Sequence, residues 1–296
     1  MKTSKFSIHQ CRSVVEACDL LSRLDDVKIL AGGQSLVPLM NQRIVSPSNL
    51  VDINNVSGLN QVTVTESGVT IGATVRQSAV EKSADVRSQL PVIGAALAHV
   101  GHPQIRNRGT VVGSICHAEA SAEVPAVLSA LGGKITVSGA SGERDIDVAD
   151  FYRASEAAPL AADELATAVT FDALGADTGW SFQEVTRRKF GVAIVGVVTV
   201  VTVTDGTISN ARIAVHGAGT VNRRVAEFEA ALIGADSTAI DRSGEAILDL
   251  LAPTALSFAS DFHASAGYRR VAARQLVAKG IRTAVRRAAA ASPVAA

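Results

Sequence analysis

The sequence has few aromatic residues and no excess of charge of either sign. Phe, Trp and Tyr make up 4% of the 296 residues, and Lys plus Arg equals Asp plus Glu at 28 each. A nucleic-acid surface needs clustered positive charge, so this balance argues against a dedicated nucleic-acid binder. The length is sufficient for two domains, whose cores must be built from small aliphatic side chains.

Cysteine and metal-ligand patterns are also scarce. The three cysteines, Cys11, Cys18 and Cys116, show no CxxC spacing, so they cannot supply the four thiolates of an iron–sulfur cluster. The six histidines show no HExxH or comparable spacing. We therefore expect no metal site on this chain and no disulfide framework.

Long apolar runs and an N-terminal targeting pattern are missing as well. The most apolar stretch, residues 192–203, is too short to cross a bilayer and contains Thr199 and Thr202, so we interpret it as a buried strand. No charged segment followed by an apolar one opens the chain, as a secretory signal peptide would. We expect a cytoplasmic protein with no membrane span.

The first part of the chain predicts a strand–turn–helix–strand unit. Apolar residues recur at helical spacing over residues 13–24, and short apolar strands are expected at 28–31 and 50–53. Ser35 is placed to cap a helix over about 35–42. A glycine turn that follows a strand in such a unit is a common position for nucleotide phosphates.

The remaining pattern predicts a mixed sheet with helices and then a second domain. In the middle region, strands are expected at residues 62–64, 69–71, 134–137 and 144–146, with helices at 75–83, 91–100 and 122–131. After a composition shift near 175–179, strands are expected at 181–186, 195–204 and 208–215, with helices at 223–232, 242–251 and 264–287. Asp205-Gly206 predicts a tight hairpin, and residues 288–296 are expected to be disordered.

Two glycine-containing segments are the most informative feature. The first is Ala-Gly-Gly-Gln-Ser-Leu at 31–36, and the second is Arg-Asn-Arg-Gly-Thr-Val-Val-Gly-Ser at 106–114. Glycine lets a backbone approach a diphosphate closely, and Ser or Thr adds a donor. One such segment alone would indicate only a tight turn. Two of them favour a dinucleotide held between subdomains, which we interpret as FAD.

These segments belong to an ordered series of motifs that resembles a known family. The series continues with Leu-Val-Asp-Ile at 50–53, Pro-Gln-Ile-Arg-Asn at 103–107, Asp-Glu-Leu at 163–165, Phe-Gln-Glu-Val-Thr-Arg-Arg at 182–188, Ala-Arg-Ile-Ala at 211–214 and the stretch 261–269. Over nearly its whole length the chain resembles the FAD-binding medium subunit of the molybdenum hydroxylases. That family includes carbon monoxide dehydrogenase, N-heterocycle hydroxylases and the flavin domain of xanthine dehydrogenase.

The resemblance implies an α+β fold with a two-subdomain FAD-binding domain of the PCMH type. A domain with a three-stranded antiparallel sheet and a helical bundle follows. The implied boundaries are 1–57 and 58–176 for the two FAD-binding subdomains and 177–296 for the C-terminal domain. The order of elements expected from the sequence pattern alone is the same.

The resemblance also implies which residues contact the cofactor. Residues 31–35 and 110–114 would hold the pyrophosphate, Glu123 stands where relatives place an Asp near the ribityl or ribose hydroxyls, and Leu160 would pack near the isoalloxazine. Relatives usually have glycine at Val112, whose side chain is expected to crowd the approach, and many have an aromatic residue at Val192. The implied contacts are Ala31, Gly32, Gly33, Gln34, Ser35, Leu36, Thr110, Val111, Val112, Gly113, Ser114, Glu123 and Leu160.

The function implied by the resemblance is electron transfer within a complex. The organic substrate would be oxidised at molybdopterin on a large partner subunit, and electrons would pass through [2Fe-2S] clusters on a small subunit to FAD and then to an external acceptor. An (αβγ)2 assembly is implied, and no catalytic residue is expected on this chain. An N-heterocycle or related aromatic is favoured as substrate, with an aldehyde, carbon monoxide or a purine left open.

Two other classes of function stay open. A self-contained flavin reductase or oxidase of the same fold needs an acid–base residue that faces the flavin N5, and the sequence offers no convincing candidate. A non-catalytic nucleotide-binding scaffold is the other class. Bound FAD would exclude the scaffold, and co-purified molybdenum and iron–sulfur subunits would exclude the self-contained enzyme.

Several polar residues near the glycine segments have both a structural and a functional interpretation. Arg106 and Arg108 either neutralise a diphosphate or brace the turn, with neither favoured. For Asp52 we favour a turn cap, for Cys116 a small buried hydrophobe, and for His117 a loop position over one beside the flavin. A basic set of residues is expected to form a solvated face or a subunit-docking surface: Arg269, Arg270, Arg274, Lys279, Arg282, Arg286 and Arg287.

Overall fold

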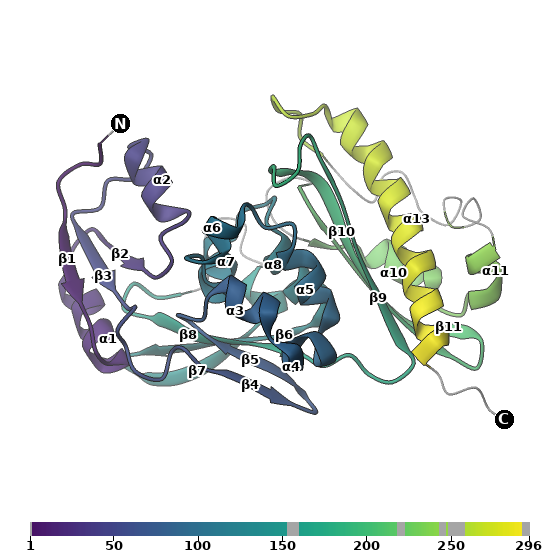
Figure 1. The fold of residues 1–296 in the computed structure, drawn as a ribbon, viewed down its shortest axis with the longest axis horizontal. Helices are drawn as coiled ribbons and strands as arrows, with labels where there is room; N and C mark the ends of the chain where they lie inside the picture. The colour runs from purple at the N-terminus through teal and green to yellow at the C-terminus, as the bar shows by residue number, and fades with distance from the viewer. Residues whose placement is uncertain (1, 153–159, 218–222, 243–246, 248–257, 292–296) are drawn as a thin grey trace.

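The structure is a computed structural model that describes residues 2–152, 160–217, 223–242, 247 and 258–291. The described residues form three β-sheets that follow one another along the chain, as Figure 1 shows. The first sheet has three strands, the second five and the third four. This arrangement confirms the α+β class, while the domain boundaries 1–57, 58–176 and 177–296 stay a prediction.

The first sheet contains the expected strand–turn–helix–strand unit and a further strand at residues 7–10 that was not expected. Its elements are β1 (Ser7–Gln10), α1 (Val14–Arg23), β2 (Val27–Leu30), α2 (Leu36–Asn41) and β3 (Asn49–Asp52). The strands are parallel in the order β1-β3-β2. Ser13 caps α1 by accepting a hydrogen bond from the peptide N–H of Glu16. Ser35 precedes α2, but its hydroxyl accepts no capping hydrogen bond, so that expectation is wrong: its backbone is already helical, at φ −102° and ψ −49°.

The second sheet is entirely antiparallel. It contains β4 (Val62–Thr65), β5 (Gly68–Gly72), β6 (Gly133–Gly139), β7 (Gly142–Asp147) and β8 (Leu165–Asp172) in the order β4-β5-β8-β6-β7. The expected mixed sheet is wrong, because every strand pair in this sheet is antiparallel. The unexpected strand β8 lies at its centre, where it pairs with β5 and β6.

The helices of this region lie between β5 and β8 in the chain. They are α3 (Gln77–Lys82), α4 (Ala84–Gln89), α5 (Pro91–Leu97), α6 (Pro103–Arg106), α7 (Val111–His117), α8 (Glu123–Leu131) and the short α9 (Val148–Phe151). Every residue of α8 is buried, because this helix packs against α5 on one side and against the third sheet on the other. Helix α7 occupies a stretch expected to be a loop.

The third sheet consists of long antiparallel strands and one short edge strand. They are β9 (Thr178–Thr186), β10 (Ala193–Thr204), β11 (Thr207–His216) and β12 (Arg223–Arg224), in the order β12-β11-β10-β9. The Asp205-Gly206 hairpin is confirmed, with φ of +49° and +78° at its two residues. The expected three-stranded sheet is therefore present, with β12 added at its edge.

Helices cover the outer face of the third sheet. They are α10 (Ala226–Leu232), α11 (Ser237–Arg242) and α13 (Ala266–Ala291), and α13 runs across β9 and β10 (Figure 1). Residues 288–291, expected to be disordered, are part of α13. Most of the helix expected at 242–251, and the rest of the tail, lie outside the described residues.

The two faces of the third sheet belong to two different cores. Val198 and Val200 of β10 join the large core of the first two sheets and their helices, together with the partly buried Phe182 of β9. On the other face, a second core contains Val195 and Val197 with the inner side of α13. The C-terminal sheet is thus fixed against α5 and α8, which brings the start of β10 to the cavity described below.

Candidate cofactor-binding site

A cavity of about 680 Å³ lies where the first unit, the second sheet with its helices and the start of β10 meet. This volume is in the range of sites that enclose a small-molecule ligand. Every expected cofactor contact except Val111 lines it, namely Ala31, Gly32, Gly33, Gln34, Ser35, Leu36, Thr110, Val112, Gly113, Ser114, Glu123 and Leu160.

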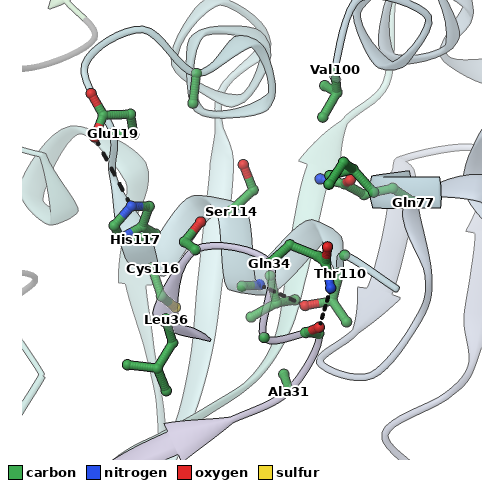
Figure 2. Close-up of a pocket in the computed structure, with 18 of the residues that line it drawn as sticks. Ala31, Gln34, Leu36, Gln77, Val100, Thr110, Ser114, Cys116, His117 and Glu119 are labelled. Carbon is green, nitrogen blue, oxygen red and sulfur yellow. Dashed lines mark hydrogen bonds and ion pairs between the residues drawn. The ribbon is translucent and has the colours of Figure 1, made fainter. Parts of the chain in front are cut away.

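The first glycine segment forms an open turn at the end of β2. Gly33 has a φ of +71°, a conformation that L side chains rarely adopt. The side-chain amide of Gln34 donates a hydrogen bond to the carbonyl of Gly32 at 3.1 Å (Figure 2). Among the residues that the structure describes, none accepts a hydrogen bond from the peptide N–H of Gly33, Gln34 or Ser35. The turn therefore lines the cavity with backbone donors that a ligand can use.

The two glycine segments touch each other through their backbones. A Cβ atom at Gly32 would lie 2.4 Å from the carbonyl oxygen of Arg108 and 2.8 Å from Cα of Gly109. The same carbonyl of Arg108 accepts a hydrogen bond from Nη1 of Arg76 at 2.9 Å, and Gly109 accepts one from the peptide N–H of Gln77 at 2.9 Å. Only glycine at position 32 permits this junction, which holds the two sides of the cavity together.

The second glycine segment turns directly into a helix. Thr110 caps α7, because its hydroxyl accepts a hydrogen bond from the peptide N–H of Gly113 at 3.0 Å. Val111 is fully buried and Val112 is 3% exposed, and both belong to the large core. The expected loop at 110–114 is therefore the first turn of α7. The Val112 side chain is packed in the core and also lines the cavity, and its crowding of a bound cofactor stays a prediction.

Two charged residues near the glycine segments, Arg106 and Asp52, have structural roles. Arg106 is 7% exposed and donates to the Glu81 carboxylate at 2.8 and 3.1 Å and to two carbonyls of residues 100–101. It braces the turn that precedes α6. Asp52 accepts hydrogen bonds from the peptide N–H and side-chain amide of Asn54, which makes it a turn cap as favoured.

Cys116, His117 and Glu119 line one end of the cavity (Figure 2). Cys116 is only partly buried, but desolvation by the surrounding protein raises the pKa of its thiol to about 12, so the group stays neutral. Nε2 of His117 lies 4.0 Å from Oε2 of Glu119. Val192, 57% exposed, lies on the wall contributed by the start of β10.

Sequence reasoning did not single out Gln77 or the buried environment of Glu123. Gln77 lines the cavity, is 4% exposed, and its Oε1 has no hydrogen-bond partner among the described residues. Glu123 is 9% exposed at the start of α8, and burial together with the negative charge of Glu184 raises the pKa of its carboxyl to about 7. The cavity therefore contains an acid that titrates near neutral pH.

The basic residues of α13 do not form one solvated face. The guanidinium of Arg269 is buried and donates to the carbonyl of Ile194 and to Asp261, while that of Arg287 lies 3.7 Å from the centre of the Trp180 ring. These residues hold α13 onto the sheet.

No described helix is both long and apolar enough to cross a membrane. Nor does the described part of the chain contain a cluster of three or more metal-ligating side chains.

Fold and site together define a dinucleotide-binding flavoprotein domain, and comparison with known families agrees. Residues 4–171 match the family described as "FAD binding domain in molybdopterin dehydrogenase". Residues 180–284 match the "CO dehydrogenase flavoprotein C-terminal domain". The chain belongs to this family of FAD-binding oxidoreductase subunits, which confirms the predicted family and cofactor.

Individual relatives are similar over nearly their whole length. The nicotine 6-hydroxylase medium subunit of Paenarthrobacter nicotinovorans is 38% identical over 91% of this chain and 93% of that protein. Among solved structures, carbon monoxide dehydrogenase of Hydrogenophaga pseudoflava matches with a TM-score of 0.90 and 31% identity, covering 97% and 99% of the two chains. Quinoline 2-oxidoreductase from Pseudomonas putida 86 matches with a TM-score of 0.89, 31% identity and the same coverage.

Proposed function

We propose that this chain is the electron-transfer flavoprotein subunit of a molybdenum hydroxylase complex. It binds FAD in the cavity, receives electrons from [2Fe-2S] clusters on a small partner subunit and passes them to an external acceptor. The observation that supports this most strongly is the backbone junction at Gly32, which closes the two glycine segments around one cavity.

The residues present fit a bound dinucleotide. Peptide N–H groups of Gly33, Gln34 and Ser35 are available donors for a diphosphate on one side, and the start of α7 faces it from the other. Glu123 and Leu160 both line the cavity. The carboxyl of Glu123 would hydrogen-bond a hydroxyl of the ribityl or ribose group, and Leu160 would pack beside the ring system. The apolar part of the wall would limit the access of water to the bound cofactor.

The cofactor and the chain would have separate tasks. A flavin supplies the ability to accept electrons singly and to release them as a pair. The chain binds and orients the cofactor, and its described residues include no metal-ligand cluster of their own. Oxidation of the organic substrate belongs to a molybdopterin subunit, in an (αβγ)2 complex of the cytoplasm.

The substrate that we propose for the complex is an N-heterocycle or a related aromatic. Relatives with 38% and 36% identity are subunits of nicotine 6-hydroxylase and caffeine dehydrogenase, and both nicotine and caffeine contain nitrogen heterocycles. The carbon monoxide dehydrogenase medium chain of Hydrogenophaga pseudoflava is 30% identical. The identities thus favour a heterocycle over carbon monoxide.

Affinity purification of the tagged chain from its native host tests the proposal. We expect stoichiometric FAD together with two further subunits that contain molybdenum and iron. A yellow chain that purifies alone and turns over an organic substrate would instead identify a self-contained flavin reductase or oxidase. A colourless chain that takes up no added FAD would overturn both.

A further inference from the structure

Four ionisable side chains from four separate segments of the chain lie close together, and one of them, Glu123, lines the cavity. Glu184 lies on β9, His216 at the end of β11, His99 after α5, and Glu123 at the start of α8. Glu184 faces the FAD-binding half, as does its neighbour Phe182, whose ring centre lies 5.1 Å from that of His99 and 5.7 Å from that of His216. We call these four residues the acid–base cluster.

Glu184 is the buried centre of the acid–base cluster. Its side chain is 0% exposed, with Oε1 3.3 Å from Nδ1 of His99 and Oε2 3.9 Å from Nε2 of His216. Neither carboxylate oxygen has a well-aligned hydrogen-bond donor among the described residues. Burying a carboxylate that accepts so few hydrogen bonds costs free energy unless a neighbouring group provides a proton.

His216 cannot provide that proton in its neutral form. Its Nδ1 lies 3.1 Å from the carbonyl oxygen of Ser121, so Nδ1 bears the hydrogen and donates it there. Nε2 then presents a lone pair to Glu184. Gly196 leaves room for this ring, because a Cβ at that position would lie 2.0 Å from Nε2. Burial lowers the pKa of His216, which favours the neutral form.

His99 connects the acid–base cluster to solvent. Its side chain is 45% exposed, while its Nδ1 faces Glu184. The interaction with Glu184 raises the pKa of His99. Glu123 connects the cluster to the cavity that it lines, and its pKa is raised by burial and by Glu184 and lowered by the charge of His99. The charges that act on Glu123 therefore come from the other cluster members.

We propose that the acid–base cluster is a proton-uptake site that balances the negative charge brought to the cavity when a bound cofactor is reduced. Two electrons enter the cavity from an external donor, and the flavin ring takes up one proton from water, which leaves one negative charge on the reduced cofactor. Glu123, the cluster member that lines the cavity, binds a second proton, which enters from water at His99 and neutralises that charge. The inference rests on the proposed binding of FAD in this cavity.

The full-length chain loaded with FAD tests this inference. The midpoint potential of the flavin is measured against pH with dithionite and a reference dye, for wild type, Glu184→Gln, His99→Gln and the control Glu143→Gln, which is exposed on β7. A proton bound per two electrons changes the reduction equilibrium tenfold per pH unit, about 30 mV. Labelled-carboxyl NMR follows the titration of Glu123 in the same samples.

The two cluster variants are expected to shift the titration in opposite directions. The inflection is the pH at which the plot of flavin midpoint potential against pH changes slope. Glu184→Gln removes a negative charge and lowers this pH by about one unit, while His99→Gln removes a positive charge and raises it by about one unit. The control keeps the wild-type inflection. A shift in the same direction for both variants, or no shift in either, would overturn the inference.

FAD content and thermal unfolding are measured for every variant. Should Glu184→Gln fail to fold, the half-exposed His99→Gln decides alone: a raised inflection supports the inference and an unmoved one overturns it. A wild-type chain that binds no FAD contradicts the proposed function itself. A chain that binds FAD but shows unmoved inflections contradicts only the proton-uptake role.

Discussion

The two glycine segments at the cavity have similar compositions but different backbone structures. Residues 31–36 form an open turn with a positive φ at Gly33 and peptide N–H groups free of partners among the described residues. Residues 110–114 begin a capped helix whose Val111 and Val112 are packed in the core. The first segment is suited to donate hydrogen bonds to a ligand, and the second to form a rigid opposing wall. Substitutions that separate these two roles test the comparison.

The largest effect is expected at the junction between the segments. In Gly32→Ala the new Cβ would lie 2.4 Å from a backbone oxygen of the second segment, which a side-chain rotation cannot relieve. We expect the variant to lose its FAD during gel filtration, measured as flavin absorbance per chain. Gly94→Ala is the control, since its Cβ would meet its nearest neighbour, Cγ of Arg87, at an ordinary 3.7 Å. Full FAD retention in Gly32→Ala would contradict the junction's role.

The next effect is a pH-dependent change in stability at Glu123, which follows the second segment. Its pKa of about 7 in the folded chain lies above its ordinary value of 4.5, so the folded state binds more protons than the unfolded state between these values. The wild type therefore loses stability as pH rises through this window. Glu123→Gln removes that loss, a gain of about 3 kcal/mol at pH 8 and much less at pH 5. Urea unfolding at both pH values measures the difference, and an equal effect at both would contradict the account.

A smaller effect is expected at the open turn itself. Gly33→Ala places a side chain at φ +71°, at a cost of about 1–2 kcal/mol, and its Cβ would lie 3.2 Å from Cδ1 of Leu30 and 3.3 Å from Cγ2 of Val37. Gly58→Ala has a φ of +84° and open space around its Cβ, so it matches the strain without touching the cavity. Both variants should lose similar stability, but only Gly33→Ala should bind FAD more weakly in a fluorescence titration. Equal FAD affinity in the two variants would contradict the assignment of the first segment to the FAD site.

The smallest effect distinguishes the two hydroxyl residues that precede α2 and α7. Thr110→Val removes a helix cap and should lower the free energy of unfolding by about 1 kcal/mol. Ser35 makes no capping hydrogen bond, so Ser35→Ala should leave the FAD-free chain as stable as the wild type. Chemical denaturation of the FAD-free variants checks this, and an equal loss in both would contradict the difference between the segments.

Local patterns predicted the elements whose partners are close in sequence. The Asp205-Gly206 hairpin and the β2–α2–β3 unit were correct because turn chemistry and periodicity specify them, whereas strand β1 was missed. Helix α7 was missed because Val, Gly and Ser have modest helix propensity, which burial against the core overrides. Strand β8 was missed although Thr alternates with apolar residues in it, and its central position depends on pairing with distant β5 and on β6.

The candidate site was predictable to the extent that it depends on motifs. The glycine segments and Glu123 line one cavity, as their motifs implied. The acid–base cluster was not predictable, because His99, Glu184 and His216 are far apart in the chain and have no characteristic spacing. Only the packing of the third sheet against α5 and α8 brings them together.

A crystal structure of the chain with FAD tests the central claim most directly. The account predicts that the diphosphate lies between residues 32–35 and 110–114, within hydrogen-bond distance of the free peptide N–H groups of the first segment. Density for the diphosphate elsewhere on the chain, with the glycine junction intact and the cavity filled only by water, would contradict it.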